Sequence, residues 1–412
     1  MKKLKIAFIV QSFPTVSETF VVNQIINLID EGYDVTIFSF NKNTNPIIHK
    51  NVLDYKLIDK TIYWEETKIS KIGRFIEFLT FLLKNHEHIS FRKIFRIFNF
   101  KKYGKKALNL RNYTRYRWIT KQASFDIFHA HFGPSGKYVA EMKSFGFFSN
   151  AKFITSFHGY DISPHLLSYY IADYKLLFSE VDLLTVNTIY TEKLLRRITR
   201  KNKIEILPVG LNTRIFKGNA LSENNKVQLL FVGRLISFKA PDLVIKIAEK
   251  LIQNGKQFHI DIIGEGVMYT QLEEYIHKNS LDNFIKLRGA LSQEEIISYM
   301  SKSDIFIFPG IYDSNGRAET QGLVLQEAQA MELPVIVSDV GGMKYGMINN
   351  ITGFVVEEKN IAGFVDKIEL LIADKELRKE MGKQGRKFVV SNYDSKVLGN
   401  KLTALYDQIL NE

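Results

Sequence analysis

Two neighbouring segments decide the fold of this chain: Asp304-Ile-Phe-Ile-Phe-Pro309 and Glu319-Thr-Gln-Gly-Leu-Val-Leu-Gln-Glu327. The first is a short apolar run, typical of a strand that is buried on both faces of a sheet. The second predicts a helix that runs from Glu319 to Met331. In an open parallel α/β sheet, ligands bind beyond the carboxyl ends of the strands, so we expect the start of this helix at a ligand-binding crevice.

The two glutamates of this helix are a candidate binding pair. On one helix, Glu319 and Glu327 would lie about two turns apart on the same face. The amides of Thr320 to Leu323 would form a positive helix end that suits a phosphate. One carboxylate can accept hydrogen bonds from sugar hydroxyls and the other from a ribose diol, which predicts a nucleotide-sugar site. Taken alone, the segment fits two ordinary surface glutamates better, because glutamate is mostly exposed.

Strand and helix patterns alternate along both halves of the chain. In the first half, one helix is expected at Glu18–Ile29 and strands at Lys5–Val10, Asp34–Phe40, Asp126–His131, Lys152–Phe157, Asp182–Val186 and Ile204–Pro208. In the second half, the expected elements are strands at Val227–Val232, Phe258–Ile263, Ile285–Leu287, Asp304–Phe308, Pro334–Ser338 and Gly353–Val356, with helices at Pro241–Asn254, Gln271–Asn279 and Gln293–Ser301. Such alternation predicts parallel sheets covered by helices. We therefore expect an α/β protein of two tandem Rossmann-like domains with a ligand cleft between them.

The domain boundaries follow from turn-rich sequence. The stretch Pro208-Val-Gly-Leu-Asn212 reads as an interdomain hinge, and Asp394 to Leu410 is a last amphipathic helix. We expect a first domain at residues 1–207 with an insertion at about 62–121, a linker at 208–218, a second domain at 219–393 and a terminal helix at 394–412.

Composition narrows the class of protein. The 412 residues include no cysteine, which excludes disulfides and thiolate metal sites. The amino-terminal run reads as a first strand rather than a signal peptide, and no apolar run reaches the length of a membrane span. We therefore expect a cytoplasmic protein that is soluble or peripheral at the inner face of the membrane.

The net charge of +12 is concentrated between Lys68 and Lys121, where only Glu77 and Glu87 oppose many cations. Aromatic residues are interleaved with these cations, a composition that favours contact with an anionic membrane surface. Two other interpretations stay open: an aromatic core under a solvated basic face, and a single-strand nucleic-acid groove, which we do not expect. The cations assigned to the membrane surface are Arg92, Lys93, Arg96, Lys101 and Lys102.

A candidate phosphate clamp follows the first strand of the second half, in Gly233-Arg-Leu-Ile-Ser-Phe-Lys239. Arg234 offers a planar fork and Lys239 a point charge, the two cation types that hold a diphosphate. Both would also stabilise a departing nucleoside diphosphate. The alternative is two surface cations in a basic protein.

The stretch Ile263-Gly-Glu-Gly-Val-Met-Tyr269 matches only part of the dinucleotide fingerprint. Gly264 and Gly266 occupy its first two glycine positions, but Tyr269 stands at the third. This departure excludes a nicotinamide or flavin dehydrogenase. We expect the two glycines to let the loop approach a nucleotide closely.

Histidines and one early glutamate complete the candidates in the first half. His158, in Phe157-His-Gly-Tyr-Asp161, follows a strand and could hydrogen-bond a substrate hydroxyl, or be a structural histidine. His129 and His131 share a strand face, but lack a carboxylate at metal-ligand spacing, so no metal is expected. Ser17 is a good helix cap, and Glu18 in the first turn either supports the helix or reaches the cleft.

Taken together, these motifs resemble the retaining glycosyltransferases of family 4, which have the GT-B arrangement of two Rossmann-like domains. The resemblance covers nearly the whole chain, and Ser17-Glu-Thr-Phe20 and His129-Ala-His131 are similar to enzymes of bacterial exopolysaccharide or capsule assembly. It implies a sugar transfer from a nucleotide-sugar to a glycan or lipid-linked acceptor, with no cofactor or metal, and a last helix that crosses back to the first domain.

By position, the resemblance also implies roles for single residues. Arg234 and Lys239 would bind the donor diphosphate, Glu319 the donor sugar and Glu327 the ribose, while His158 would line the reaction centre. The amides near Gly322 and Leu323 would contact the phosphates.

Some positions depart from the family pattern. The first loop reads Pro14-Thr-Val-Ser17 instead of carrying paired glycines, Ala240 and Thr320 replace frequent glycines, and no Pro-Glu follows Gly341-Gly342. Because of these departures, the resemblance does not identify the sugar that the donor carries. Two other functions remain as alternatives: a nucleotide-sugar epimerase of similar architecture, and a non-catalytic basic protein that binds membrane or nucleic acid.

Overall fold

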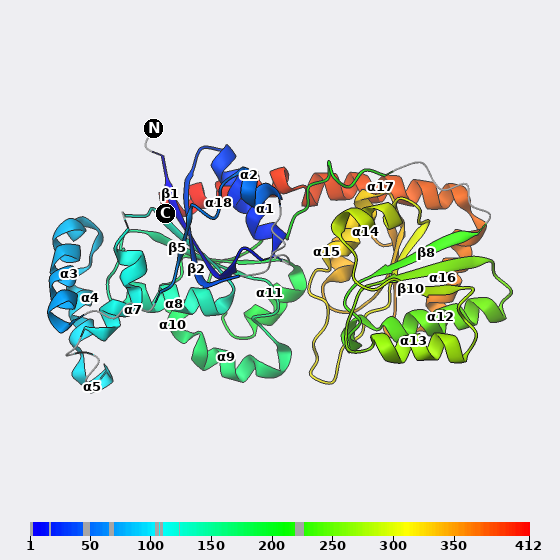
Figure 1. Cartoon of the computed structure of the whole chain (residues 1–412), viewed down its shortest axis with the longest axis horizontal. Helices are drawn as coiled ribbons and strands as arrows, with labels where there is room; N and C mark the ends of the chain where they lie inside the picture. Colours follow the sequence, from blue (N-terminus) through cyan, green and yellow to red (C-terminus); the bar gives the residue numbers. More distant parts are fainter. Residues whose placement is uncertain are drawn as a thin grey trace.

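The computed structural model describes residues 3–15, 18–43, 50–65, 70–103, 107, 110–122, 124–218 and 226–412. Two sheets form its frame, one in each half of the molecule, and all their strand pairs are parallel (Figure 1). The predicted fold class, α/β with two tandem parallel-sheet domains, is therefore confirmed. The domain boundaries given above stay predictions.

The first sheet has seven strands in the order β3-β2-β1-β4-β5-β6-β7. Its strands are β1 Lys5–Phe13, β2 Asp34–Lys42, β3 Thr61–Tyr63, β4 Ile127–His131, β5 Lys152–Phe157, β6 Leu183–Val186 and β7 Ile204–Ile206. The connecting helices are α1 Thr19–Asp30, α2 Lys50–Asp54, α8 Gly133–Ser144, α9 Leu167–Asp173, α10 Lys175–Glu180 and α11 Ile189–Arg196. Residues 6–10 of β1 are fully buried because helices cover both faces of the sheet.

The second sheet has six strands in the order β10-β9-β8-β11-β12-β13. Its strands are β8 Val227–Val232, β9 Phe258–Ile263, β10 Ile285–Leu287, β11 Ile305–Phe308, β12 Val335–Ser338 and β13 Gly353–Val356. Its helices are α12 Pro241–Gln253, α13 Tyr269–Lys278, α14 Gln293–Met300, α15 Leu323–Ala330, α16 Ile361–Ala373 and α17 Lys375–Tyr393.

The last helix, α18 Ser395–Asn411, returns from the second half to the first (Figure 1). Its residues Leu398, Leu402 and Tyr406 are buried in the same apolar cluster as helix α1. At the crossing point, the Thr213 hydroxyl donates a hydrogen bond of 2.6 Å to Asp394. The chain thus connects the two halves twice, through the linker and through α18.

The basic insertion forms short helices at one end of the molecule: α3 Lys71–Lys84, α4 Phe91–Ile94, α5 Phe100–Tyr103 and α7 Arg111–Thr120, with 3-10 turns η1 His86–His88 and η2 Phe95–Phe98 (Figure 1). Its aromatic residues divide into two groups. One group is core, as the solvated-face interpretation expects: Phe78, Phe81, Tyr113, Tyr116 and Trp118. The other group is exposed: Phe75, Phe91, Phe95, Phe98 and Phe100. No helix among the described residues is long and apolar enough to cross a membrane.

Two helix starts differ from the prediction. Helix α15 begins only at Leu323, because Gly322 adopts a left-handed backbone with φ +70°. Glu319 therefore lies in the loop after β11, and the prediction of one helix that carries both glutamates is wrong. Helix α1 begins at Thr19, so Glu18 precedes its first turn and makes no side-chain capping bond. Ser17, the expected cap, lies outside the described residues.

Candidate active site

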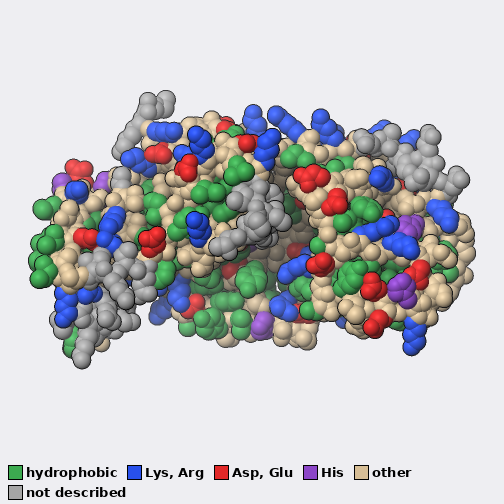
Figure 2. All heavy atoms as spheres, viewed as in Figure 1, with side chains coloured by type: hydrophobic (Ala, Val, Ile, Leu, Met, Phe, Trp, Pro, Cys, Tyr) green, Lys and Arg blue, Asp and Glu red, His purple; other side chains and the backbone are tan. Residues whose placement is uncertain are grey.

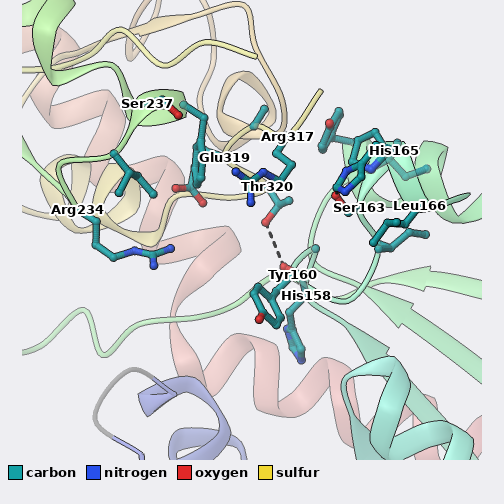
Figure 3. Close-up of a pocket in the computed structure, with 18 of the residues that line it drawn as sticks. His158, Tyr160, Ser163, His165, Leu166, Arg234, Ser237, Arg317, Glu319 and Thr320 are labelled. Carbon is teal, nitrogen blue, oxygen red and sulfur yellow. Dashed lines mark hydrogen bonds between the residues drawn. The ribbon is translucent and has the colours of Figure 1, made fainter. Parts of the chain in front are cut away.

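A cavity of about 900 Å³ lies between the two halves, and the surface is hollowed there (Figure 2). Its first-domain wall mixes aromatic, aliphatic and small residues and includes His158 and Tyr160. Its second-domain wall carries the charged residues Arg234, Arg317 and Glu319 among apolar ones such as Phe238 and Met268. Figure 3 shows Arg234 and Glu319 near each other, across the cavity from His158 and Tyr160.

An ion pair lies at the base of the charged wall. The Lys239 Nζ atom is 2.8 Å from a carboxylate oxygen of Glu319, and both side chains are largely buried. Lys239 also lies over the ring of Phe308, 5.5 Å from its centroid. Arg234 is exposed at the same wall. The structure therefore brings three of the predicted donor residues together.

The charges around Glu319 keep it ionised. Burial would raise the pKa of this carboxyl, but the charge and hydrogen bond of Lys239 lower it more, with help from the Thr320 amide and Arg234. The net result is a pKa below the ordinary glutamate value. At neutral pH Glu319 is thus an acceptor of hydrogen bonds, and cannot donate a proton.

The Gly264 turn packs against the loop that carries Arg234. Gly264 has φ +140°, and a Cβ atom there would lie 2.0 Å from the carbonyl oxygen of Gly233. At Gly266, a Cβ atom would lie 2.3 Å from the carbonyl oxygen of Leu235. Both glycines are needed for this contact between two backbones. That they also admit a nucleotide stays a prediction.

His158 belongs to a group of stacked histidines. Its Nε2 atom lies 3.1 Å from Nδ1 of His131, and the two rings are stacked. Burial lowers the pKa of His158 to about 3 and the pKa of His131 well below its ordinary value, so both are neutral at physiological pH. His129 bonds Tyr406 and Ser156. Among the described residues, no cluster of three or more potential ligands could hold a metal ion.

The turn that presents His158 is held by Asp161, which we did not single out from the sequence. The buried Asp161 carboxylate accepts hydrogen bonds from the amides of Gly133, His158 and Gly159. Burial raises the pKa of Asp161 to about 6, although these amides lower it. An aspartate just after a His-Gly turn is a recognisable signal, because such side chains often bond nearby amides.

Neither Glu18 nor Glu327 is among the residues that line the interdomain cavity. Burial raises the pKa of Glu18, and the next aromatic residue, Phe20, contacts the His158 ring at a centroid distance of 4.7 Å. Glu327 and Leu323 line a separate cavity of about 260 Å³ beside helix α1. Burial raises the pKa of Glu327 to about 7. The structure therefore does not gather both glutamates of the predicted pair in one cavity.

The five cations assigned to the membrane surface have different surroundings. Arg92 and Lys101 are exposed. Lys93 pairs with Glu180 at 3.2 Å, and Arg96 donates a hydrogen bond to the Ser144 carbonyl. Lys102 belongs to α5, but its side chain is outside the described part of the structure.

Two parallel-sheet domains with a charged cleft between them define the class of GT-B glycosyltransferases, and comparisons with known proteins agree. Residues 17–215 match the family model "Glycosyltransferase Family 4", and residues 212–388 match "Glycosyl transferases group 1". The chain belongs to this family of glycosyltransferases. It is an enzyme of that class, as the sequence predicted, and the comparisons support this function rather than either alternative.

Relatives match over most of their length. The amylovoran biosynthesis glycosyltransferase AmsK of Erwinia amylovora is 30% identical over 361 residues, which cover 86% of this chain and 87% of the relative. WcaL of Escherichia coli strain K12, named for colanic acid biosynthesis, is 25% identical over 98% of this chain and 99% of its own.

Solved structures share the fold. Anabaena HepE in complex with UDP superposes with a TM-score of 0.71 at 15% identity, covering 98% of this chain and all of that one. A glycosyltransferase from Rickettsia africae superposes with a TM-score of 0.70 at 20% identity, over the full length of both chains.

Proposed function

We propose that this glycosyltransferase moves a hexose-type sugar, with retention of anomeric configuration, from a nucleotide-sugar to a lipid-linked glycan of a bacterial surface polysaccharide. The observation that carries this proposal is Glu319, which lines the interdomain cavity together with Arg234 and forms an ion pair with Lys239. Two cations and an ionised carboxylate on one wall suit a diphosphate joined to a polyhydroxyl group.

On the donor side, Arg234 and Lys239 would bind the diphosphate and stabilise the charge that develops on it as the sugar leaves. Glu319 would accept hydrogen bonds from the donor sugar, and the amides at Gly322 and Leu323 would bind phosphate. Glu327 would accept from the ribose diol, which requires the nucleoside to extend from the interdomain cavity into the separate cavity that Leu323 and Glu327 line. The Anabaena HepE structures contain UDP and UDP-glucose, which supports a nucleotide-sugar donor. With cations already on this wall, the proposal requires no metal.

The proposed reaction follows from the protonation states. The acceptor hydroxyl attacks the anomeric carbon from the side of the departing phosphate, the glycosidic bond to that phosphate breaks, and the phosphate takes the hydroxyl proton. His158 has a pKa of about 3 because it is buried, so it acts as a neutral hydrogen-bond partner and not as an acid. Glu319 stays ionised throughout, and stabilises positive charge on the sugar.

The acceptor assignment has two supports. The relatives named for amylovoran, colanic acid and Staphylococcus aureus capsule biosynthesis point to surface polysaccharides. In addition, α3 exposes one apolar face to solvent, formed by Ile72, Phe75, Ile76, Leu79 and Leu83. Lys71 and Lys84, at the two ends of α3, are exposed as well. An exposed apolar patch with cations beside it suits a peripheral contact with an anionic membrane, where a lipid-linked acceptor resides. Figure 2 shows hydrophobic side chains gathered at this end of the molecule.

The proposal is tested first by measuring the thermal stability of the pure protein with UDP, GDP, ADP, CMP and their sugars. A donor at about a hundred times its dissociation constant adds ~2.7 kcal/mol to the free energy of unfolding. We expect one nucleotide to raise the unfolding midpoint, and Lys239→Ala to abolish that rise. Absence of any shift with every nucleotide at millimolar concentration would contradict the donor assignment.

Product analysis then separates transfer from donor interconversion. Incubated with the selected nucleotide-sugar alone, the enzyme should leave the sugar configuration unchanged. With membrane-extracted glycolipid added, the sugar should appear on the lipid fraction with its anomeric configuration retained. An inverted product would refute retention and leave the donor assignment intact.

A further inference from the structure

The loop that carries Glu319 is fastened to the first domain through its next residue, Thr320. The Thr320 hydroxyl donates a hydrogen bond of 3.1 Å to the His158 carbonyl, drawn as the dashed line in Figure 3. The same hydroxyl accepts one of 3.3 Å from Asn187 Nδ2. The Thr188 hydroxyl donates one of 2.9 Å to the Thr320 carbonyl. We call these three hydrogen bonds the Thr320 clasp.

The backbone on both sides of Thr320 leaves no free space. A Cβ atom at Gly159, where φ is +98°, would lie 2.2 Å from the Thr320 methyl carbon. On the other side, a Cβ atom at Gly342 would lie 1.6 Å from the Thr320 carbonyl oxygen. Gly342 also donates its amide to the Glu319 carbonyl at 2.8 Å. Thr320 is therefore held between a first-domain turn and a second-domain turn, both of which need glycine.

Gln321, the next residue, also forms hydrogen bonds outside the second domain. Val209 of the linker donates its amide to Gln321 Oε1 at 2.8 Å, and accepts from Gln321 Nε2 at 2.7 Å. The Gln321 side chain is buried. Two successive residues after Glu319 are thus bonded outside the second domain, by five hydrogen bonds in all.

We infer that Thr320 is a positioning residue, which sets Glu319 of the donor wall at a fixed distance from His158 of the opposite wall. The Thr320 hydroxyl donates a hydrogen bond to the carbonyl of His158, and Thr320 is covalently joined to Glu319 as the next residue of the chain. The separation of these two groups is therefore maintained by Thr320, with no ligand needed. This inference rests on the proposed function for the roles of Glu319 and His158.

Two substitutions separate the hydroxyl from the packing. Thr320→Val keeps the side-chain shape but removes two hydrogen bonds, so kcat should fall about tenfold. Thr320→Ser keeps the hydroxyl, and its kcat should stay within about threefold of wild type. Affinity for the nucleoside diphosphate that wild type binds best, UDP or GDP, should be unchanged in Thr320→Val by calorimetry, because Arg234, Lys239 and Glu319 are intact.

Asn187→Asp provides a second variant, because it removes the amide that donates to both the Thr320 hydroxyl and the His158 carbonyl, but keeps the oxygen that accepts from Thr191. Combined with Thr320→Val, it should lower kcat by less than the product of the single effects, since both variants remove the Asn187–Thr320 bond and each also removes a bond to the His158 carbonyl. A kcat equal to wild type in Thr320→Val would overturn the inference. So would an equal loss in Thr320→Ser, which would assign the effect to packing.

Small-angle X-ray scattering tests the clasp without any activity measurement. We expect Thr320→Val to increase the radius of gyration of the unliganded protein, and Thr320→Ser to match wild type. If wild type transfers no sugar from any donor but scattering still separates the two variants, the proposed function fails and the clasp stands. Identical scattering of all three proteins would reject the clasp.

Discussion

At the scale of single residues, the candidate donor-binding side chains could be predicted from the sequence, but the residues that they contact could not. Arg234, Lys239 and Glu319 follow strands, and the rule that parallel sheets bind ligands at strand carboxyl ends places them at one edge. That Lys239 pairs with Glu319 depends on two loops meeting, which one-dimensional spacing does not encode. Thr320 was missed as a partner for the same reason, since it bonds the His158 carbonyl, which is distant in sequence. For Asp161 only the bond to the Gly133 amide is distant, and its local bonds to His158 and Gly159 could have been predicted.

The Lys239–Glu319 pair predicts non-additive loss of activity. Lys239→Ala and Glu319→Ala should each lower kcat about a hundredfold, or ~3 kcal/mol, because each removes a charge near the reacting phosphate and sugar. The double variant should lose little more than the worse single variant, since the two groups act as a unit. Steady-state kinetics on all three variants measures this, with exposed Lys246→Ala as the charge-matched control. Fully additive losses would show that the two residues act independently.

The raised pKa of Glu327 predicts a pH-dependent stability. Its folded pKa of about 7 exceeds the ordinary value of 4.5, so the folded protein binds the proton more tightly than the unfolded chain. The resulting stabilisation is complete below about pH 4.5 and lost as pH rises to about 7. Partial exposure limits the effect to about 1–3 kcal/mol.

Denaturant unfolding of wild type and Glu327→Gln at pH 5 and pH 8 isolates this contribution, because other titrating groups cancel in the difference. We expect Glu327→Gln to gain stability relative to wild type between the two pH values. A difference that does not change with pH would show that Glu327 titrates normally.

At the scale of elements, apolar runs predicted the buried strands well, because a strand covered on both faces must be continuously apolar. Helix starts were less predictable. The left-handed backbone at Gly322 shortens α15, and a glycine permits this conformation without dictating it. The individual helices of the insertion were not predicted, because they depend on packing between aromatic residues such as Phe81 and Tyr113.

The backbone contact at Gly264 predicts a site-specific loss of stability. A Cβ atom there would meet the Gly233 carbonyl at 2.0 Å, whereas Gly255, also with positive φ, has no atom within 4 Å of its Cβ position. Gly264→Ala should therefore cost more than about 3 kcal/mol, and Gly255→Ala about 1 kcal/mol from backbone strain alone. Calorimetric unfolding measures both. Equal costs would mean that the Gly233 loop moves aside freely.

At the scale of the whole molecule, the repeat of the strand–helix pattern predicted two sheets, and the resemblance to family 4 glycosyltransferases implied that the last helix returns to the first domain. The sequence could not reveal how the halves are fastened, because the Thr320 clasp joins residues that lie far apart in the chain. Nor could it divide the insertion into core and exposed parts, since both kinds of phenylalanine occur at similar spacing.

The surroundings of the insertion's cations decide which of them can be used to test the expected membrane contact. Reversing the charge of Lys93 or Arg96 would also break their contacts to Glu180 and to the Ser144 carbonyl, which connect the insertion to the rest of the first domain. Arg92 and Lys101 are exposed, so Arg92→Glu with Lys101→Glu tests charge alone. Each cation near an anionic surface contributes about 1 kcal/mol. The double charge reversal should therefore lower the affinity for vesicles containing anionic lipid, measured by co-sedimentation, by at least about tenfold. The loss of affinity should be smaller at high salt, where charges are screened.

The apolar face of α3 should contribute separately. Ile72 and Leu83 are 74% and 78% exposed, so Ile72→Ser with Leu83→Ser removes apolar area without disturbing the core. If this face enters the bilayer, the double variant should bind the same vesicles about tenfold more weakly at every salt concentration, because the apolar contribution is not screened. Ile348→Ser with Ile351→Ser, two exposed positions on the second domain, is the matched control and should bind like wild type. Unchanged vesicle binding in both the apolar and the charge-reversal variants would place the acceptor-bearing membrane elsewhere on the molecule.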